Sequence, residues 1–352
     1  MTDENALEEQ ILAQLSTVIE PELRRDLVSL NMIRDLTVDG STAHFTMTLT
    51  TPACPLKGQI EAAAREAVLR VDGIDAAQIK LDSSVPADQR ITGQMNLAIK
   101  SLIAVSSGKG GVGKSTIAAN LAIALRQSGA AVGLMDADIL GPNLPMMLGV
   151  KQMPPPVNQR LIPAEAYGIK LMSMGFLVPP GQPLVWRGPM LHSAIRQFFS
   201  DVEWGELDYM VIDLPPGTGD AQLTLAQSVP LTGAIIVTQP QDVALDDALR
   251  GLAMFEKLEV PIIGVVENMS GEFFGEGGGQ RLADARSVPF LGAVPLDPQV
   301  RIGGDDGRPI VVEAPDSPAA QVLIEIAQAV AARVSVLNIS RQDDIIPLTT
   351  IG

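Results

Sequence analysis

The 352-residue sequence has little of what several classes of protein depend on. One cysteine excludes an intramolecular disulfide framework, and one cysteine with two histidines leaves few soft ligands for a transition metal. A net charge of −16 disfavours loose attachment to DNA or anionic lipid. No apolar run reaches the roughly 18 residues of a membrane span, and the N-terminus is acidic, unlike a signal peptide. We therefore expect a cytoplasmic protein with no nucleic-acid partner and no membrane partner.

The composition that is present, 46% hydrophobic and 19% charged residues, is that of a globular protein, and the length suggests two domains. Residues 1–82 are expected to form a small α/β unit. Apolar residues recur there at helical spacing up to Pro21, and residues 43–50 alternate apolar and polar as a half-buried strand does. The mixed, polar segment 83–100 is interpreted as a linker.

Strand and helix patterns alternate along residues 101–337 in the way that builds a mostly parallel sheet with helices on both faces. Residues 338–352 are interpreted as a C-terminal tail. The expected strands are 102–106, 131–135, 209–214, 234–238, 262–266 and 290–294. The expected helices are 115–127, 189–199, 221–227, 244–258, 279–286 and 318–334.

A phosphate-binding motif, G-x-x-x-x-G-K-[ST], lies between the first of these strands and the first helix, the context that the motif requires. Its glycines let backbone N–H groups approach the phosphates, and the helix offers its positive N-terminus. Lys114 is expected to reach the β- and γ-phosphates, and the Ser115 hydroxyl to bind Mg²⁺. The fold class expected is therefore an α/β P-loop NTPase. The expected nucleotide-binding residues of the loop are Gly108, Lys109, Gly110, Gly111, Val112, Gly113, Lys114, Ser115 and Thr116.

Carboxylates leave two further strands at their C-terminal ends, the edge at which open α/β sheets bind ligands. We assign Asp136 and Asp213 to the Mg²⁺ side, and Asp138 to the orientation of the attacking water. Gly217 is expected to sense the γ-phosphate through its backbone N–H. A solvated loop around Asp136 and Asp138, and a rigid proline turn before Gly217, are the alternatives.

Lys109 is one lysine more than a phosphate-binding loop needs. It resembles the signature lysine of the deviant Walker A group, which includes nitrogenase iron protein, MinD, ParA and Mrp/ApbC. The resemblance implies a homodimer that sandwiches two ATP molecules, in which Lys109 crosses to the nucleotide of the facing subunit and acts in catalysis with Lys114 and Asp138. A solvated loop lysine is the alternative.

Further motifs resemble the Mrp/ApbC iron-sulfur carrier branch across nearly all of residues 102–312. Among them are the segment from Trp186 to Met190 and the segments around the acids above. A buried tryptophan with a structural arginine is the alternative for Trp186 and Arg187. Asn268, Pro295 and Asp297 resemble the adenine-contacting positions of the group, with a cap or turn residue as the alternative for the lone Asn. The resemblance implies slow ATP hydrolysis that depends on Mg²⁺ and on dimerisation.

The N-terminal unit resembles the small domain of iron-sulfur assembly factors, through Glu20-Pro21-Glu22-Leu23 and Thr50-Thr51-Pro52-Ala53-Cys54-Pro55. Cys54 is expected at a helix N-terminus, where the helix dipole lowers a thiol pKa, and it is a candidate iron-sulfur ligand. The alternative is a buried, inert cysteine.

One departure from the branch concerns the metal. Typical members hold a cluster across the dimer with a Cys-x-x-Cys pair shortly after Asn-Met-Ser, but residues 267–270 here run into 271–279 without a cysteine. A [4Fe–4S] cluster normally needs four thiolates, and a dimer of this chain has only two. The first hypothesis is an ATPase that delivers a transient iron-sulfur cluster to apoprotein clients, with Cys54, a partner protein or a small thiol completing the site. The alternative is a nucleotide-switched ATPase of MinD/ParA type that binds a protein client and carries no cluster.

Overall fold

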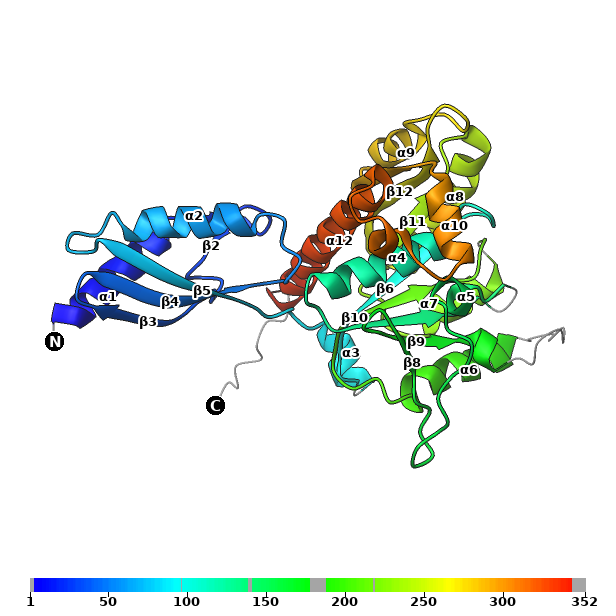
Figure 1. The fold of residues 1–352 in the computed structure, drawn as a ribbon, viewed down its shortest axis with the longest axis horizontal. Helices are drawn as coiled ribbons and strands as arrows, with labels where there is room; N and C mark the ends of the chain where they lie inside the picture. The colour runs from blue at the N-terminus through cyan, green and yellow to red at the C-terminus, as the bar shows by residue number, and fades with distance from the viewer. Residues whose placement is uncertain (1–2, 96, 139–140, 178–187, 218, 344–352) are drawn as a thin grey trace. The chain divides into compact units, whose positions relative to one another are not determined.

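The computed structural model describes residues 3–95, 97–138, 141–177, 188–217 and 219–343 (Figure 1). Contacts divide the chain into two compact units, Met1–Pro86 and Ala87–Gly352. The Trp186-Arg187 pair lies outside the described residues.

The first unit is a three-stranded sheet packed against two helices. The middle strand is antiparallel to one neighbour and parallel to the other, in the order β3-β4-β5. Ala43, Phe45 and Met47 alternate into the core, as the sequence pattern predicts. The elements are α1 (Asp3–Leu15), β1 (Ile19–Glu20), β2 (Arg25–Asp26), β3 (Ile33–Asp39), β4 (Thr42–Leu49), α2 (Lys57–Val68) and β5 (Ala76–Ser83).

The second unit contains an eight-stranded sheet in the order β13-β12-β11-β6-β10-β7-β9-β8. All neighbouring strands are parallel except β8 and β9. Its strands are β6 (Ile99–Ser107), β7 (Val132–Asp136), β8 (Ala164–Ala166), β9 (Ile169–Ser173), β10 (Leu207–Asp213), β11 (Gly233–Thr238), β12 (Ile262–Ser270) and β13 (Phe290–Pro295).

Helices flank this sheet, which confirms the α/β class predicted from the sequence. Phe198, Leu225 and Phe255 bring three helices into one apolar cluster, whereas α4 and α12 pack on each other. The helices are α3 (Gln89–Gln94), α4 (Lys114–Gln127), α5 (Leu144–Met147), α6 (Gly188–Ser200), α7 (Asp220–Ser228), α8 (Asp242–Lys257), α9 (Gly278–Arg286), α10 (Pro298–Asp305), α11 (Ile310–Glu313) and α12 (Pro318–Asp343).

The structure differs from the expected segmentation at three places. The segment interpreted as a linker contains α3, and β6 already begins at Ile99. The antiparallel pair of β8 and β9, with β8 at the edge of the sheet, is additional, and the three residues of β8 give little periodic signal. Helix α12 continues to Asp343, so the first residues of the expected tail are helical.

Helix α12 is long and apolar enough to cross a membrane by length and composition alone. Half of the most apolar stretch of 18 residues in this helix is buried, and Leu323, Ile326 and Val330 are almost fully inaccessible to solvent. Near its end, Arg341 pairs with buried Asp88 at 2.8 Å. Burial against its own unit therefore accounts for the apolar side chains on one face of this helix.

Candidate nucleotide site

The phosphate-binding loop connects β6 to α4, and its glycines are required by its shape. Gly111 and Gly113 have φ angles of +81° and +85°, a region that side chains with a Cβ rarely adopt. A Cβ at Gly108 would lie 2.1 Å from the backbone of Asp247, so α8 leaves no room for one. The loop is thus built as the sequence motif predicts.

Buried charges join this loop to the end of β10. The Lys114 ammonium lies 2.5 Å from Asp213 Oδ1, and the Ser115 hydroxyl donates to Asp213 Oδ2 at 2.6 Å. Lys114 is only 6% exposed and Asp213 is fully buried. The structure therefore brings together the predicted phosphate-binding lysine, the predicted Mg²⁺ hydroxyl and the predicted acid.

Asp136 ends β7, opposite Asp213 in the sheet register. Its carboxylate accepts hydrogen bonds from Ser173 Oγ at 3.0 Å and from the Leu144 N–H at 3.2 Å. Burial, together with the negative charge of Asp213, raises the pKa of Asp136 to about 8. Burial likewise raises the pKa of Asp213, against the opposing effect of Lys114. Two carboxylates with raised pKa values next to a phosphate loop favour a bound cation, and their oxygens suit Mg²⁺.

The other predicted residues of the reaction centre lie on the segments that follow these strands. Asp138 is buried, accepts from the Gly141 N–H at 3.1 Å and is close enough to raise the pKa of Asp213. Gly217 has a φ of +93°, and its N–H donates to the Ser107 carbonyl at 3.0 Å. The predicted γ-phosphate sensor is therefore engaged by the carbonyl just before the phosphate loop.

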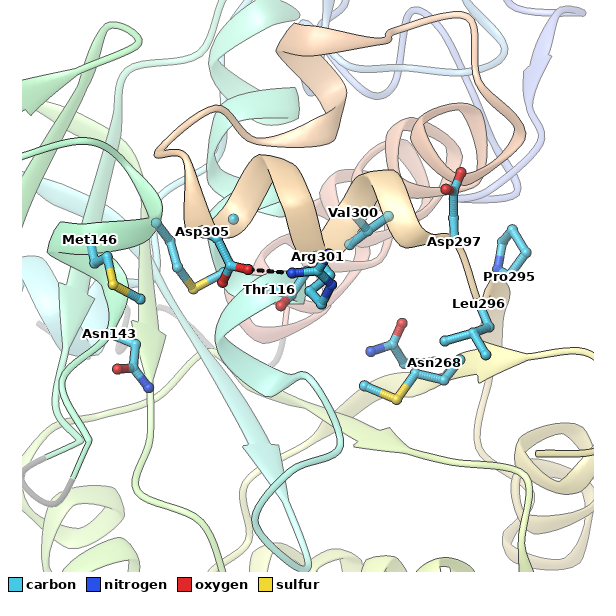
Figure 2. Close-up of a pocket in the computed structure, with 13 residues that line it drawn as sticks. Thr116, Asn143, Met146, Asn268, Pro295, Leu296, Asp297, Val300, Arg301 and Asp305 are labelled. Carbon is cyan, nitrogen blue, oxygen red and sulfur yellow. Dashed lines mark hydrogen bonds and ion pairs between the residues drawn. The ribbon is translucent and has the colours of Figure 1, made fainter. Parts of the chain in front are cut away.

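A cavity of about 310 Å³ lies beside the start of α4 (Figure 2). Thr116, Asn268, Pro295 and Asp297, all predicted to contact the nucleotide, line it. Asn268 also donates from Nδ2 to the Val112 carbonyl at 2.8 Å. This amide thus connects the cavity wall to the phosphate loop.

Sequence reasoning missed the opposite wall of the cavity, which α5 and α10 provide (Figure 2). Arg301 and Asp305 form an ion pair of 2.6 Å there. The signal for α10 was present, because Asp297 followed by proline is a typical helix start and Asp297 caps the Gln299 N–H at 2.8 Å. The missed lining residues include Asn143, Met146, Val300, Arg301 and Asp305.

Lys109 begins the loop in a half-buried position. Its backbone carbonyl accepts from Ser107 Oγ at 2.9 Å. Its ammonium has no acidic partner within the part of the chain that the structure describes.

Cys54, in the other unit, lies just before α2 and is half-buried. Burial raises the pKa of its thiol, and the nearby charges of Glu22 and Glu20 raise it further, against backbone hydrogen bonds that lower it. The prediction that the helix N-terminus lowers this pKa is therefore wrong in its net direction. No group of three or more His, Cys, Asp or Glu side chains is arranged to hold a metal ion among the described residues.

Comparison with known proteins gives matches to both units. A family model described as NUBPL iron-transfer P-loop NTPase matches residues 98–331, and one described as iron-sulfur cluster assembly protein matches residues 8–81. The iron-sulfur cluster carrier protein of Synechocystis sp. is 49% identical, over 92% of this chain and 97% of its own length. The protein of the same name from Deinococcus radiodurans is 48% identical, over 97% and 100% respectively.

Solved structures resemble the second unit. The nucleotide-binding protein of Archaeoglobus fulgidus, in complex with ADP, has a TM-score of 0.56 and 36% identity, over 66% of this chain and 94% of that one. The cell division ATPase MinD of Pyrococcus furiosus has a TM-score of 0.54 and 25% identity, over 65% and 97%. The fold around the phosphate loop is thus a nucleotide-binding fold.

Proposed function

Because the chain belongs to the family of NUBPL iron-transfer P-loop NTPases, we propose that it is a cytoplasmic, Mg²⁺-dependent ATPase. We propose further that it works as a homodimer and delivers iron-sulfur clusters to apoproteins. The buried network of Lys114, Ser115 and Asp213 is the observation that carries the ATPase part.

Each residue of the site has a distinct part in this proposal. Lys114 leaves Asp213 for the β- and γ-phosphates, because two phosphate oxygens outcompete one carboxylate for the ammonium. Ser115 and, through water, Asp213 would hold Mg²⁺, which would neutralise charge on the phosphates. Asp136 would help to organise the water shell of that ion, and Asp138 would orient the attacking water.

The proposed dimer rests on Lys109. Its ammonium has no ion-pair partner in the described part of its own chain, and it stands at the entrance of the loop. In the proposed dimer it approaches the nucleotide of the facing subunit and stabilises charge that develops during phosphoryl transfer. Gly217 reports hydrolysis, because its N–H exchanges the γ-phosphate for the Ser107 carbonyl.

In this proposal the cluster is cargo, and Cys54 is the thiol through which this chain binds it. Its raised pKa keeps it protonated until iron binds, and metal binding then releases the proton. Two copies supply two thiolates, so a client protein or a small thiol contributes the remaining ligands. Incomplete ligation suits a transient site, because a cluster that is weakly held is easily passed on.

Anaerobic reconstitution tests this proposal. The full chain is incubated with iron, sulfide and glutathione, and absorption spectra are recorded for wild type and Cys54→Ala. The expected result is charge-transfer absorption from the wild type and its loss in the variant, with ATP hydrolysis unchanged in both. No absorption in either protein, with an apoprotein acceptor present, would contradict cluster delivery and leave the ATPase assignment standing.

A nucleotide-switched ATPase that binds a protein client without a cluster is the second candidate. The single cysteine and its raised thiol pKa favour it. If this candidate is right, the affinity for the client differs between the ATP-bound and ADP-bound protein. That difference is the same with and without iron.

A further inference from the structure

Strand β9 brings a buried serine to the acid that ends β7. Asp136 and Ser173 are paired in the register of the two strands, and neither residue is exposed to solvent. The Ser173 hydroxyl donates to Asp136 Oδ2 at 3.0 Å. The same hydroxyl oxygen accepts from the Gly175 N–H at 3.0 Å, at the start of a short 3₁₀ helix, Met174–Phe176. One hydroxyl therefore connects the end of β9 to this acid.

The two hydrogen bonds use the hydroxyl in both directions. A lone pair of its oxygen receives the Gly175 N–H, and its proton is directed at Asp136. An ionised aspartate at position 173 would cap the 3₁₀ helix equally well, but it could only accept, and it would repel the carboxylate of Asp136. Capping alone therefore does not account for a serine here, whereas the contact with Asp136 does.

The donors around Asp136 are divided unequally between its two carboxylate oxygens. Oδ2 accepts from the Ser173 hydroxyl and from the Leu144 N–H, at 3.0 and 3.2 Å. Among the residues that the structure describes, Oδ1 accepts from the Asp138 N–H alone, at 3.2 Å. Because each carboxylate oxygen has two lone pairs, both positions on Oδ2 are used and one position on Oδ1 remains. The hydrogen bonds thus select which oxygen can accept from a further donor.

The segment that follows the second predicted acid packs on the same 3₁₀ helix. A Cβ at Gly175 would lie 3.1 Å from Pro142 Cβ and 3.2 Å from Ser173 Oγ, so the two segments meet with little room between them. Leu144, two residues after Pro142, supplies the second donor to Asp136 Oδ2. The end of β9 therefore holds Asp136 directly and also contacts the segment that carries Leu144.

We propose that Ser173 is a positioning residue for the cation of the nucleotide site. The proposal rests on the proposed function, which assigns Asp136 to the Mg²⁺ side. By holding Oδ2, the Ser173 hydroxyl keeps the remaining acceptor position of Oδ1 available to a water molecule of the hydrated ion. Groups that hydrogen-bond the residues around a metal fix the orientation of those residues, and their loss typically weakens metal binding by about 10- to 100-fold.

Metal binding by the full chain tests the proposal, with Mn²⁺ as a spectroscopic substitute for Mg²⁺. Mn²⁺ is titrated by electron paramagnetic resonance, with a non-hydrolysable ATP analogue present and protein in excess over the analogue. Affinity for the analogue is measured separately in EDTA. Ser173→Ala removes the hydroxyl, whereas Ser173→Thr keeps it, and a β-branched side chain suits a strand. Ser101→Ala is the matched control, because Ser101 is equally buried on β6 and its hydroxyl accepts from Asn338 Nδ2 at 2.9 Å.

The expected results distinguish an effect on the cation from a general loss of structure. We expect Ser173→Ala to weaken Mn²⁺ binding about tenfold or more, and Ser173→Thr to stay within about threefold of wild type. Ser101→Ala is expected to bind Mn²⁺ as wild type does. Affinity for the analogue in EDTA is expected to be unchanged in all three variants, because the hydroxyl acts through the cation. Urea unfolding is expected to show a similar, small loss of stability in the two alanine variants, since each loses one buried hydroxyl.

The outcomes separate this proposal from the proposed function. Wild-type binding of Mn²⁺ by Ser173→Ala, or an equal loss in Ser173→Ala and Ser173→Thr, would overturn the positioning role and leave the Mg²⁺ assignment of Asp136 standing. A loss of analogue affinity in EDTA as large as the loss of Mn²⁺ affinity would mean that Ser173 only supports the fold, and it would also overturn the proposal. A wild type that binds no more Mn²⁺ than the free analogue does would overturn the metal part of the proposed function as well.

Discussion

The nucleotide site and the Cys54 region of the N-terminal unit are prepared for their ligands to very different degrees. At the nucleotide site, buried side chains with opposite charges meet at 2.5 Å. At Cys54, a half-buried thiol has two glutamates nearby and a raised pKa. The first site is held by buried ion pairs and hydrogen bonds, whereas the thiol at the second would lose its proton only on binding a metal.

The difference follows from what each site has to do. Nucleotide binding and hydrolysis need fixed geometry, because small displacements of a catalytic group cost much of the rate. Cargo transfer needs a site that releases what it holds, and a thiol that regains its proton at release serves this purpose. The proposed function therefore combines a rigid nucleotide site with a thiol that binds metal only weakly.

Lys114→Ala is expected to have the largest effect. ATP turnover falls by on the order of 100-fold or more, because the phosphates lose their buried cation. The free protein also loses about 3 kcal/mol of unfolding free energy, since Asp213 stays buried without its partner. ATPase assays and urea unfolding measure the two effects.

Lys100→Ala provides the matched control. Lys100 pairs with Asp208 at 2.8 Å in a partly exposed position at the other end of the sheet. Its loss is expected to cost below about 1 kcal/mol and to leave turnover intact. Equal destabilisation by both substitutions would mean that the nucleotide site is not preorganised.

Lys109→Ala ranks second. Turnover and ATP-dependent dimerisation fall by about tenfold or more, while ATP affinity of the monomer remains within about twofold of wild type. Single-turnover kinetics combined with nucleotide titration separate these quantities. Behaviour identical to that of Lys114→Ala would remove the basis for a lysine that acts across the dimer.

Asn268→Ala is expected to weaken ATP binding about five- to tenfold. The rate at which bound ATP is hydrolysed is expected to change less. The substitution removes one wall of the cavity and the donor that holds the Val112 carbonyl. Isothermal titration with ATP and ADP measures it, and equal losses for both are expected because neither Asp213 nor Gly217, the proposed γ-phosphate sensor, lines the cavity. A change confined to ATP would contradict this assignment of the cavity to the nucleoside.

The smallest expected effect concerns the pH dependence of Cys54. Because its pKa is raised, the thiolate fraction at pH 8 is below that of an unperturbed cysteine, and alkylation by iodoacetamide is slower by a few-fold. The rate climbs as pH rises through the raised pKa. Glu22→Gln removes one negative charge and is expected to speed alkylation at pH 8, with Glu8→Gln as the surface control. Alkylation faster than that of free cysteine would reverse the comparison.

Strands β7 and β10 at the centre of the sheet were predictable because each is an almost wholly apolar run that ends in an acid. Asp136 and Asp213 both follow such runs, and parallel strands bring their ends together. The predicted strand 102–106 lies within β6, and the phosphate loop follows it as the motif requires.

The remainder depends on tertiary contacts that no local pattern encodes. Ser173, which donates to Asp136, lies on β9, a strand between β7 and the edge strand β8 that the sequence pattern did not reveal. Arg301 reaches the cavity through a helix of eight residues. The pKa of Cys54 was predicted from helix position alone, whereas burial and two glutamates from a distant segment decide it.

Cluster transfer to an acceptor enzyme is the most direct test of iron-sulfur delivery by this chain. Full chain loaded with iron and sulfide is mixed with an apo-acceptor of a [4Fe–4S] enzyme, and recovery of acceptor activity is followed with ATP, with ADP, and in the Lys114→Ala and Cys54→Ala variants. We predict recovery with wild type that depends on nucleotide, altered in Lys114→Ala and lost in Cys54→Ala. The proposed cluster delivery would be contradicted if acceptor activity recovered no faster than with free iron and sulfide, for every variant and with either nucleotide.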